Sequence, residues 1–194
     1  MGVNREGLEM SVKIKSPSIV LNSDAWDVLN YEMDVSMEVK KGKKIDEVFD
    51  TVAAKCENLK KQYGTFVHMV LNCHGYFRNG KGGYGLALGN GIDRSNAFIF
   101  GKIAPTVTKI YIVACNAAQV AEVGGDGDGN LFCSAIAKYA RAEVLASVDK
   151  QIGNCLVHED KGYIDDWEGT VFAYGPSGGV LSVTRYDSGG IFGN

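Results

Sequence analysis

The chain has 194 residues, of which 45% are hydrophobic and 22% charged, and its formal net charge is −3. These values are typical of a globular domain and exclude a disordered, collagen-like or coiled-coil protein. Nucleic-acid-binding proteins usually carry an excess of basic residues, which this chain lacks, so no nucleic-acid partner is expected. We expect a single domain over residues 1–194, since a chain of this length can bury a sizeable core.

The first half of the chain predicts two buried strands separated by an amphipathic helix. Residues 18–22 form a short apolar run after Pro17, which is typical of a strand. Residues 43–63 repeat apolar residues every three or four positions and end before Gly64, as a helix does. Cys56 lies on the apolar side of this helix and is predicted to be a core residue. Residues 65–72 are almost continuously apolar, which indicates a strand covered on both faces.

The second half is rich in glycine and predicts further alternation of strands and helices. Residues 84–89 resemble one arm of a hairpin, and residues 96–103 a short helix before Pro105. The remaining predicted elements are a buried strand at 109–115, a helix at 131–140, a buried strand at 143–148 and a hairpin from residue 170 onward. This alternation favours an α/β fold with a mostly parallel sheet, flanked by helices and closed by a C-terminal β-hairpin.

Membrane insertion and disulfide bonding are both disfavoured. No segment approaches the roughly 18 apolar residues of a transmembrane helix, and the first residues lack the pattern of a signal peptide. The five cysteines are odd in number, and none form a Cys-x-x-Cys pair that would indicate a zinc ribbon or disulfide framework. We therefore expect a cytoplasmic protein with free thiols, or one exported without an N-terminal signal peptide, and no membrane partner.

Two of the predicted strands lead into reactive residues. The strand at 65–72 is followed by Cys73, His74 and Gly75, and the strand at 109–115 ends in Cys115. Ligands of open α/β sheets bind beyond the carboxyl ends of the strands. If these two strands are parallel neighbours, an imidazole and a thiol lie at the same edge of the sheet.

These two blocks, Leu71-Asn-Cys-His-Gly and Ile112-Val-Ala-Cys-Asn-Ala-Ala, resemble those of the caspase-like (clan CD) cysteine peptidases. That group includes caspases, metacaspases, clostripain, gingipains, separase and bacterial CHAT domains, and the motifs are most similar to the CHAT and clostripain types. The resemblance covers roughly residues 19–183. It implies a caspase-like three-layer sandwich, cleavage of a peptide or protein substrate, and no required cofactor.

Residue by residue, the resemblance implies that Cys115 is the nucleophile and His74 the general acid/base. It also implies that the backbone N–H groups of Gly75 and Cys115 form the oxyanion hole. The chemistry agrees with these roles, because a thiolate is the attacking species and an imidazolium stabilises it and protonates the leaving amine. Backbone donors aimed at a developing oxyanion contribute about 3–4 kcal/mol.

Asp149 is a candidate substrate-binding residue, because it follows the predicted strand at 143–148 at the same edge of the sheet. Relatives that cleave after Arg or Lys hold the cationic side chain with a carboxylate, so a preference for Arg or Lys is one hypothesis. The alternative is that Asp149 caps the next turn. No arginine stands just before Cys115 where caspases have one, so a preference for Asp is not expected.

Other polar residues have plainer interpretations. Cys73 lies inside an apolar run and is predicted to be a core residue; His68 is expected to be structural and His158 to lie on the surface. The lysines at positions 40, 41, 43 and 44 are interpreted as a solvated turn.

The loop at 124–130 has Asp126, Asp128 and Asn130 at alternate positions, as in part of a calcium loop, but lacks the glycine and glutamate that such a loop requires. We expect a flexible loop instead, with Asn130 as the N-cap of the next helix. No metal site is predicted.

Two alternative functions use the same residues. One is a catalytically silent caspase-like module that binds a partner across the same edge of the sheet. The other is an amidase or acyl transferase whose His-Cys dyad acts on a non-protein substrate. The nucleophile and the acid would be identical in that enzyme and in a peptidase.

Overall fold

The fold is described from a computed structural model. It covers residues 11–25, 28, 30–78, 83–120, 123–125, 127–151, 160–165, 167 and 169–186.

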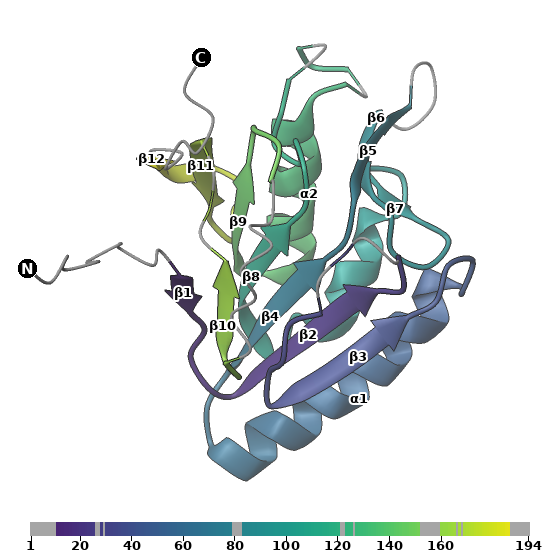
Figure 1. The fold of residues 1–194 in the computed structure, drawn as a ribbon, viewed down its shortest axis with the longest axis vertical. Coiled ribbons are helices and arrows are strands. Elements are labelled where there is room, and N and C mark those ends of the chain that lie inside the picture. The colour runs from purple at the N-terminus through teal and green to yellow at the C-terminus, as the bar shows by residue number, and fades with distance from the viewer. Residues whose placement is uncertain are drawn as a thin grey trace, which may run out of the picture.

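A seven-stranded sheet forms the centre of the molecule, with the order β12-β11-β9-β8-β4-β2-β3 (Figure 1). The strands are β2 (Ser18–Ser23), β3 (Val35–Val39), β4 (Val67–Asn72), β8 (Val107–Val113), β9 (Glu143–Ser147), β11 (Gly169–Tyr174) and β12 (Val180–Tyr186). From β3 to β9 all neighbours are parallel, whereas β11 runs antiparallel to β9 and β12 antiparallel to β11. The predicted α/β class, the mostly parallel sheet and the C-terminal hairpin are therefore confirmed.

Helix α1 (Ile45–Tyr63) follows from its apolar periodicity, and its buried residues include Phe49, Val52 and Cys56. Asp46 and Glu47 lie in its first turn and two lysines in its last, where each charge complements the helix dipole. Gly64 ends the helix in the left-handed conformation with φ 70°, which glycine adopts without steric cost. The predicted helix and the burial of Cys56 are confirmed.

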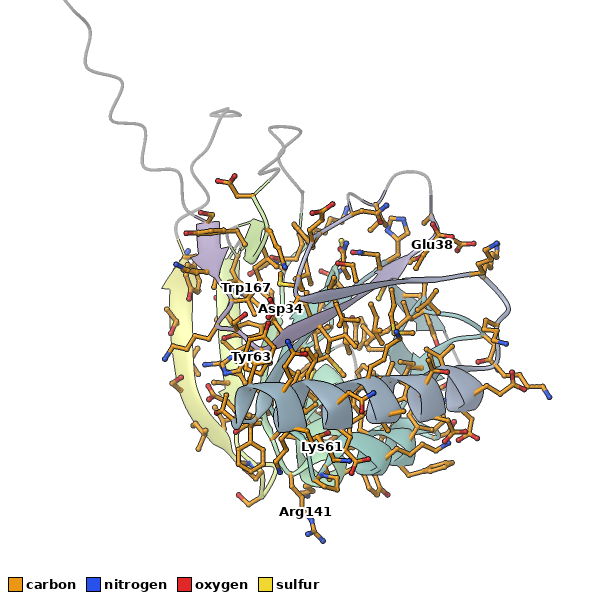
Figure 2. All side chains as sticks on the ribbon, turned by 90° about the horizontal axis from the view of Figure 1, so that it is seen from below. Asp34, Glu38, Lys61, Tyr63, Arg141 and Trp167 are labelled. Atoms are coloured by element: carbon orange, nitrogen blue, oxygen red, sulfur yellow. The ribbon has the colours of Figure 1, made fainter. Side chains whose placement is uncertain are left out.

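The described helices pack against one face of the sheet. The core cluster on that face joins residues of α1, of the 3-10 helix η1 (Ala97–Ile103) and of α2 (Gly129–Ala140) to alternate residues of the strands. Phe49 and Phe100, for example, meet edge-to-face with ring centroids 4.8 Å apart. Figure 2 shows α1 beneath the sheet, on the opposite side from Trp167.

The second face of the sheet carries β-structure and loops in the described part of the chain. Strands β1 (Ser11–Lys13) and β10 (Tyr163–Asp165) pair antiparallel. Ile14, Ile164 and Trp167 contribute to a second buried cluster with alternate residues of the central strands. The sheet is thus covered by helices on one face and by β-strands and loops on the other, which is compatible with three layers.

A small antiparallel sheet rises from the end of β4. It consists of β5 (Gly75–Arg78), β6 (Gly83–Leu86) and β7 (Ile92–Asp93), in that order. This sheet includes the predicted hairpin arm and places the residues after His74 beside the edge of the central sheet (Figure 1).

The predicted start of the second long helix is wrong by two residues. The N-cap of α2 is Asp128, whose carboxylate accepts hydrogen bonds from the backbone N–H groups of Asn130 and Leu131. Asn130 already lies in the helix, and its side-chain oxygen accepts a hydrogen bond from the Tyr174 hydroxyl instead. A carboxylate two residues upstream satisfies the free N–H groups of the first turn, so the helix begins earlier.

Candidate functional site

The carboxyl ends of the parallel strands form the edge at which the predicted catalytic residues lie. Strands β4 and β8 are neighbours, and their register pairs Asn72 with Val113. His74 and Cys115 each follow two residues after this pair. The structure therefore brings the two residues to equivalent positions at the ends of adjacent parallel strands.

The backbones of Gly75 and Cys115 are in close contact. A Cβ atom built on Gly75 would lie 1.8 Å from the carbonyl oxygen of Cys115 and 3.3 Å from its nitrogen. Only glycine allows this approach. In the described part of the chain, no backbone hydrogen bond uses the N–H of Cys115. The two backbone segments expected to form an oxyanion hole are thus next to each other.

A tight turn after β8 holds Cys115 in place. Asn116 has φ 55°, the left-handed conformation that asparagine tolerates better than most residues. Its N–H donates to the carbonyl oxygen of Asp149 at 3.0 Å, and the N–H of Ala118 donates to that of Ser147 at 2.9 Å. The turn that carries the thiol is therefore fastened to the end of β9.

Cys115 is partly exposed, whereas the other described cysteines are buried. Its Sγ donates a weak hydrogen bond to the carbonyl oxygen of Gln151, with the two atoms 3.5 Å apart. Cys73 is 5% exposed, and burial raises the pKa of its thiol to about 12. These contrasts distinguish the partly exposed Cys115 from Cys73, which is buried and is confirmed as a core residue.

His74 is exposed and lies between Cys115 and a neighbouring pocket. Its carbonyl oxygen accepts the N–H of Ala87 at 2.8 Å, which ties the end of β4 to the segment after β6. His68, at the start of β4, stacks on Tyr111 with ring centroids 6.2 Å apart. Burial lowers the pKa of His68, and the charge of Lys109 adds to this effect. His68 thus lies at the opposite end of β4 from His74, as expected for a structural residue.

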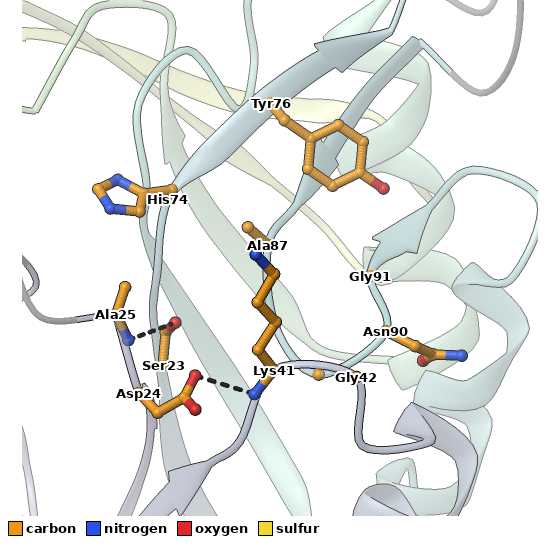
Figure 3. Close-up of a pocket in the computed structure, with 11 residues that line it drawn as sticks. Ser23, Asp24, Ala25, Lys41, Gly42, His74, Tyr76, Ala87, Asn90 and Gly91 are labelled. Atoms are coloured by element: carbon orange, nitrogen blue, oxygen red, sulfur yellow. Dashed lines mark hydrogen bonds between the residues drawn. The ribbon is translucent and has the colours of Figure 1, made fainter.

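The pocket beside His74 was not predicted from the sequence. It is a cavity of about 630 Å³ whose lining includes Asp24, Lys41, His74, Tyr76 and Asn90 (Figure 3). These residues come from the ends of β2, β3 and β4, from β5 and from the turn before β7. Lys41 and Asn90 lie in turns, where no periodic pattern signals a shared surface.

Asp149 lies at the same edge, on the opposite side of Cys115 from His74. One oxygen of its carboxylate accepts the N–H of Thr170 at 2.8 Å. A side chain on Gly169 would collide with this carboxylate, with Cβ 1.9 Å from Oδ2. Asp149 therefore fixes the entry of β11, as expected if it caps a turn, while its side chain stays exposed at the edge of the site.

The loop before α2 shows the carboxylate of Asp128 bound to backbone N–H groups. Besides the hydrogen bonds from the N–H groups of Asn130 and Leu131, this carboxylate accepts one from the backbone N–H of Gly124 at 2.9 Å. Within the described ranges, no group of three or more His, Cys, Asp or Glu side chains is arranged to hold a metal ion. Asp126, Cys155 and His158 lie outside the described residues.

No known protein-family model matches this chain, and no curated protein matches its sequence. In the described part of the chain, none of the helices combines the length and the apolar character needed to cross a membrane.

Proposed function

We propose that the protein is a cysteine peptidase of the caspase-like type, with Cys115 as nucleophile and His74 as general acid/base. The observation that supports this most strongly is the placement of both residues at the ends of adjacent parallel strands. The Gly75 backbone packs against that of Cys115 in the same place. The resemblance of the two sequence blocks to this family supplies the class of reaction.

In the acylation step, the thiolate of Cys115 attacks the carbonyl carbon of the scissile amide and forms a C–S bond. The carbonyl oxygen becomes an oxyanion, which the N–H groups of Gly75 and Cys115 stabilise. The imidazolium of His74 then donates its proton to the amide nitrogen. The C–N bond breaks, and the amine half of the substrate leaves.

In the deacylation step, a water molecule replaces the amine. His74, now neutral, takes a proton from the water as it attacks the thioester carbonyl carbon. The C–S bond breaks, the carboxylic acid half leaves and the thiolate returns. The net reaction of the two steps is hydrolysis of one amide bond.

Asp149 is proposed to favour Arg or Lys on the acyl side of the cut. Its carboxylate lies on the Cys115 side of the site, and the hydrogen bond from Thr170 occupies one of its two oxygens. The other oxygen would pair with a guanidinium or ammonium group. Asp149→Asn keeps an acceptor for Thr170 but removes the charge. It should therefore lower cleavage after Arg or Lys without unfolding β11; an unchanged preference would leave Asp149 with its capping role alone.

The proposal is tested by the alkylation rate of Cys115 with iodoacetamide, followed by peptide mass mapping of the native protein. We expect Cys115 to react at least about 10-fold faster in the wild type than in His74→Ala, because a neighbouring imidazolium stabilises the reactive thiolate. His68→Ala, at the other end of the same strand, is the matched control and should leave the rate unchanged. A rate of Cys115 alkylation equal in wild type and His74→Ala would overturn the dyad.

A further inference from the structure

The order of the strands fixes the order of the groups along the catalytic edge. The sheet order β9-β8-β4-β2-β3 corresponds, in the residues that follow those strands, to Asp149, Cys115, His74, Asp24 and Lys41. His74 therefore lies between the nucleophile and the pocket. The general acid must reach the leaving nitrogen, so the substrate half that departs lies on the His74 side. The pocket is on that side.

The walls of this pocket are held by hydrogen bonds between segments far apart in the sequence. The N–H of Gly42 donates to the carbonyl oxygen of Gly89 at 2.9 Å, and that of Asn90 to the carbonyl oxygen of Lys43 at 2.8 Å. The side-chain oxygen of Asn90 accepts the first N–H of α1, that of Ile45, at 3.0 Å. The cavity is thus formed before any ligand binds, which reduces the ordering cost of binding.

Lys41 supplies the pocket with a positive charge that the described residues leave unpaired. Asp24 accepts the backbone N–H of Lys41 at 2.9 Å and so fixes the position of its main chain. Within the described ranges, no hydrogen bond or ion pair engages the Lys41 ammonium group, whereas Lys43 and Lys44 pair with Glu47. Figure 3 shows the Lys41 side chain extending into the space that His74 and Asn90 also line.

We propose that this pocket binds the leaving half of the substrate and that Lys41 selects an acidic residue directly after the cut. The inference rests on the proposed peptidase function and adds a second specificity-determining residue to it. A carboxylate on the leaving half would pair with the Lys41 ammonium group. Tyr76, whose hydroxyl is 3.4 Å from the carbonyl oxygen of Ile92, would cover the apolar part of that side chain.

The test uses three peptides that share one cleavable sequence and differ only in having Glu, Gln or Lys after the cut. We expect the wild type to cleave the Glu peptide with about fivefold higher kcat/KM than the Gln peptide, the scale of a partly exposed ion pair. Lys41→Gln should abolish this difference, and Lys41→Glu should shift the preference to the Lys peptide. Lys40→Gln removes a neighbouring lysine outside the pocket and should keep the wild-type preference.

Cleavage of all three peptides with the same relative rates in wild type and Lys41→Gln would overturn the inference and leave the peptidase proposal standing. If the wild type cleaves no peptide sequence from which this series can be built, the peptidase proposal fails, and ligand binding then tests the pocket. The dipeptide amides Glu-Ala and Gln-Ala are then titrated against wild type and Lys41→Gln, and the backbone amide signals of Gly42 and Asn90 are followed by NMR. If the wild type binds Glu-Ala more tightly than Gln-Ala and Lys41→Gln does not, the pocket is a carboxylate site. Equal binding of the two dipeptide amides by the wild type overturns the carboxylate site.

Discussion

Replacing Gly75 with alanine should disable the site while leaving most of the fold intact. The new Cβ would lie 1.8 Å from the carbonyl oxygen of Cys115, whereas real Cβ contacts essentially never fall below 3.0 Å. The two backbones must therefore separate by at least about 1.2 Å. A displacement of about 1 Å in a catalytic group can cost roughly 100-fold in rate. Loss of one oxyanion donor costs about 100- to 1000-fold.

We therefore expect Gly75→Ala to lower kcat by at least about 100-fold, measured with a peptide that the wild type cleaves. Gly101→Ala is the matched control, because its Cβ would meet no atom closer than the Tyr139 carbonyl oxygen at 4.0 Å. Circular dichroism and thermal unfolding should show that both variants are folded. Full activity in a folded Gly75→Ala variant would refute the assignment of this contact to the oxyanion hole.

Three further predictions concern stability and thiol chemistry. Asp128→Ala should lower the free energy of unfolding by about 1–2 kcal/mol in urea titrations, because α2 loses its N-cap; an unchanged value would contradict the capping role. Cys56 and Cys73 should resist alkylation at pH 8 until the protein unfolds, since burial raises the pKa of both thiols to about 12. If Cys56 or Cys73 were labelled in the native protein as fast as Cys115, burial would not protect that thiol and the prediction would be wrong. His68 has a lowered pKa in the folded state, so wild-type stability should fall as the pH drops below about 6.5, the usual histidine pKa. His68→Phe should weaken this pH dependence, and an identical pH profile would show that another group causes it.

The elements that the sequence predicts well are those whose burial follows a local repeat. Helix α1 has an apolar side that recurs every three or four residues, and β4 and β8 are apolar almost throughout because both of their faces are covered. The positions of His74 and Cys115 follow from these strands, because a residue after a parallel strand must lie at its carboxyl end.

Strand β3 carries a local signal that the sequence analysis did not use. Its apolar residues Val35, Met37 and Val39 alternate with the exposed Ser36 and Glu38, as in a strand with one buried face, and it lies at the edge of the sheet. The pair β1–β10 has no such signal. The three-residue strands β1 and β10 come from opposite ends of the chain. Their pairing depends on the second buried cluster, which forms only when the chain has folded.

The pocket beside His74 could not be predicted for a related reason. Lys41 belongs to a lysine-rich turn that its sequence identifies only as solvated, and the structure shows its neighbours in that turn to be exposed. Hydrogen bonds from Gly42 and Asn90 bring this turn against the segment before β7. Such long-range contacts give a charged residue a functional position without any local pattern.

The most direct test of the central claim is cleavage of a peptide library by wild type and by Cys115→Ala, with the products read by mass spectrometry. We predict cuts by the wild type that are absent from Cys115→Ala and from His74→Ala, with all three proteins equally folded. The same cuts from wild type and Cys115→Ala would contradict a peptidase that uses this thiol.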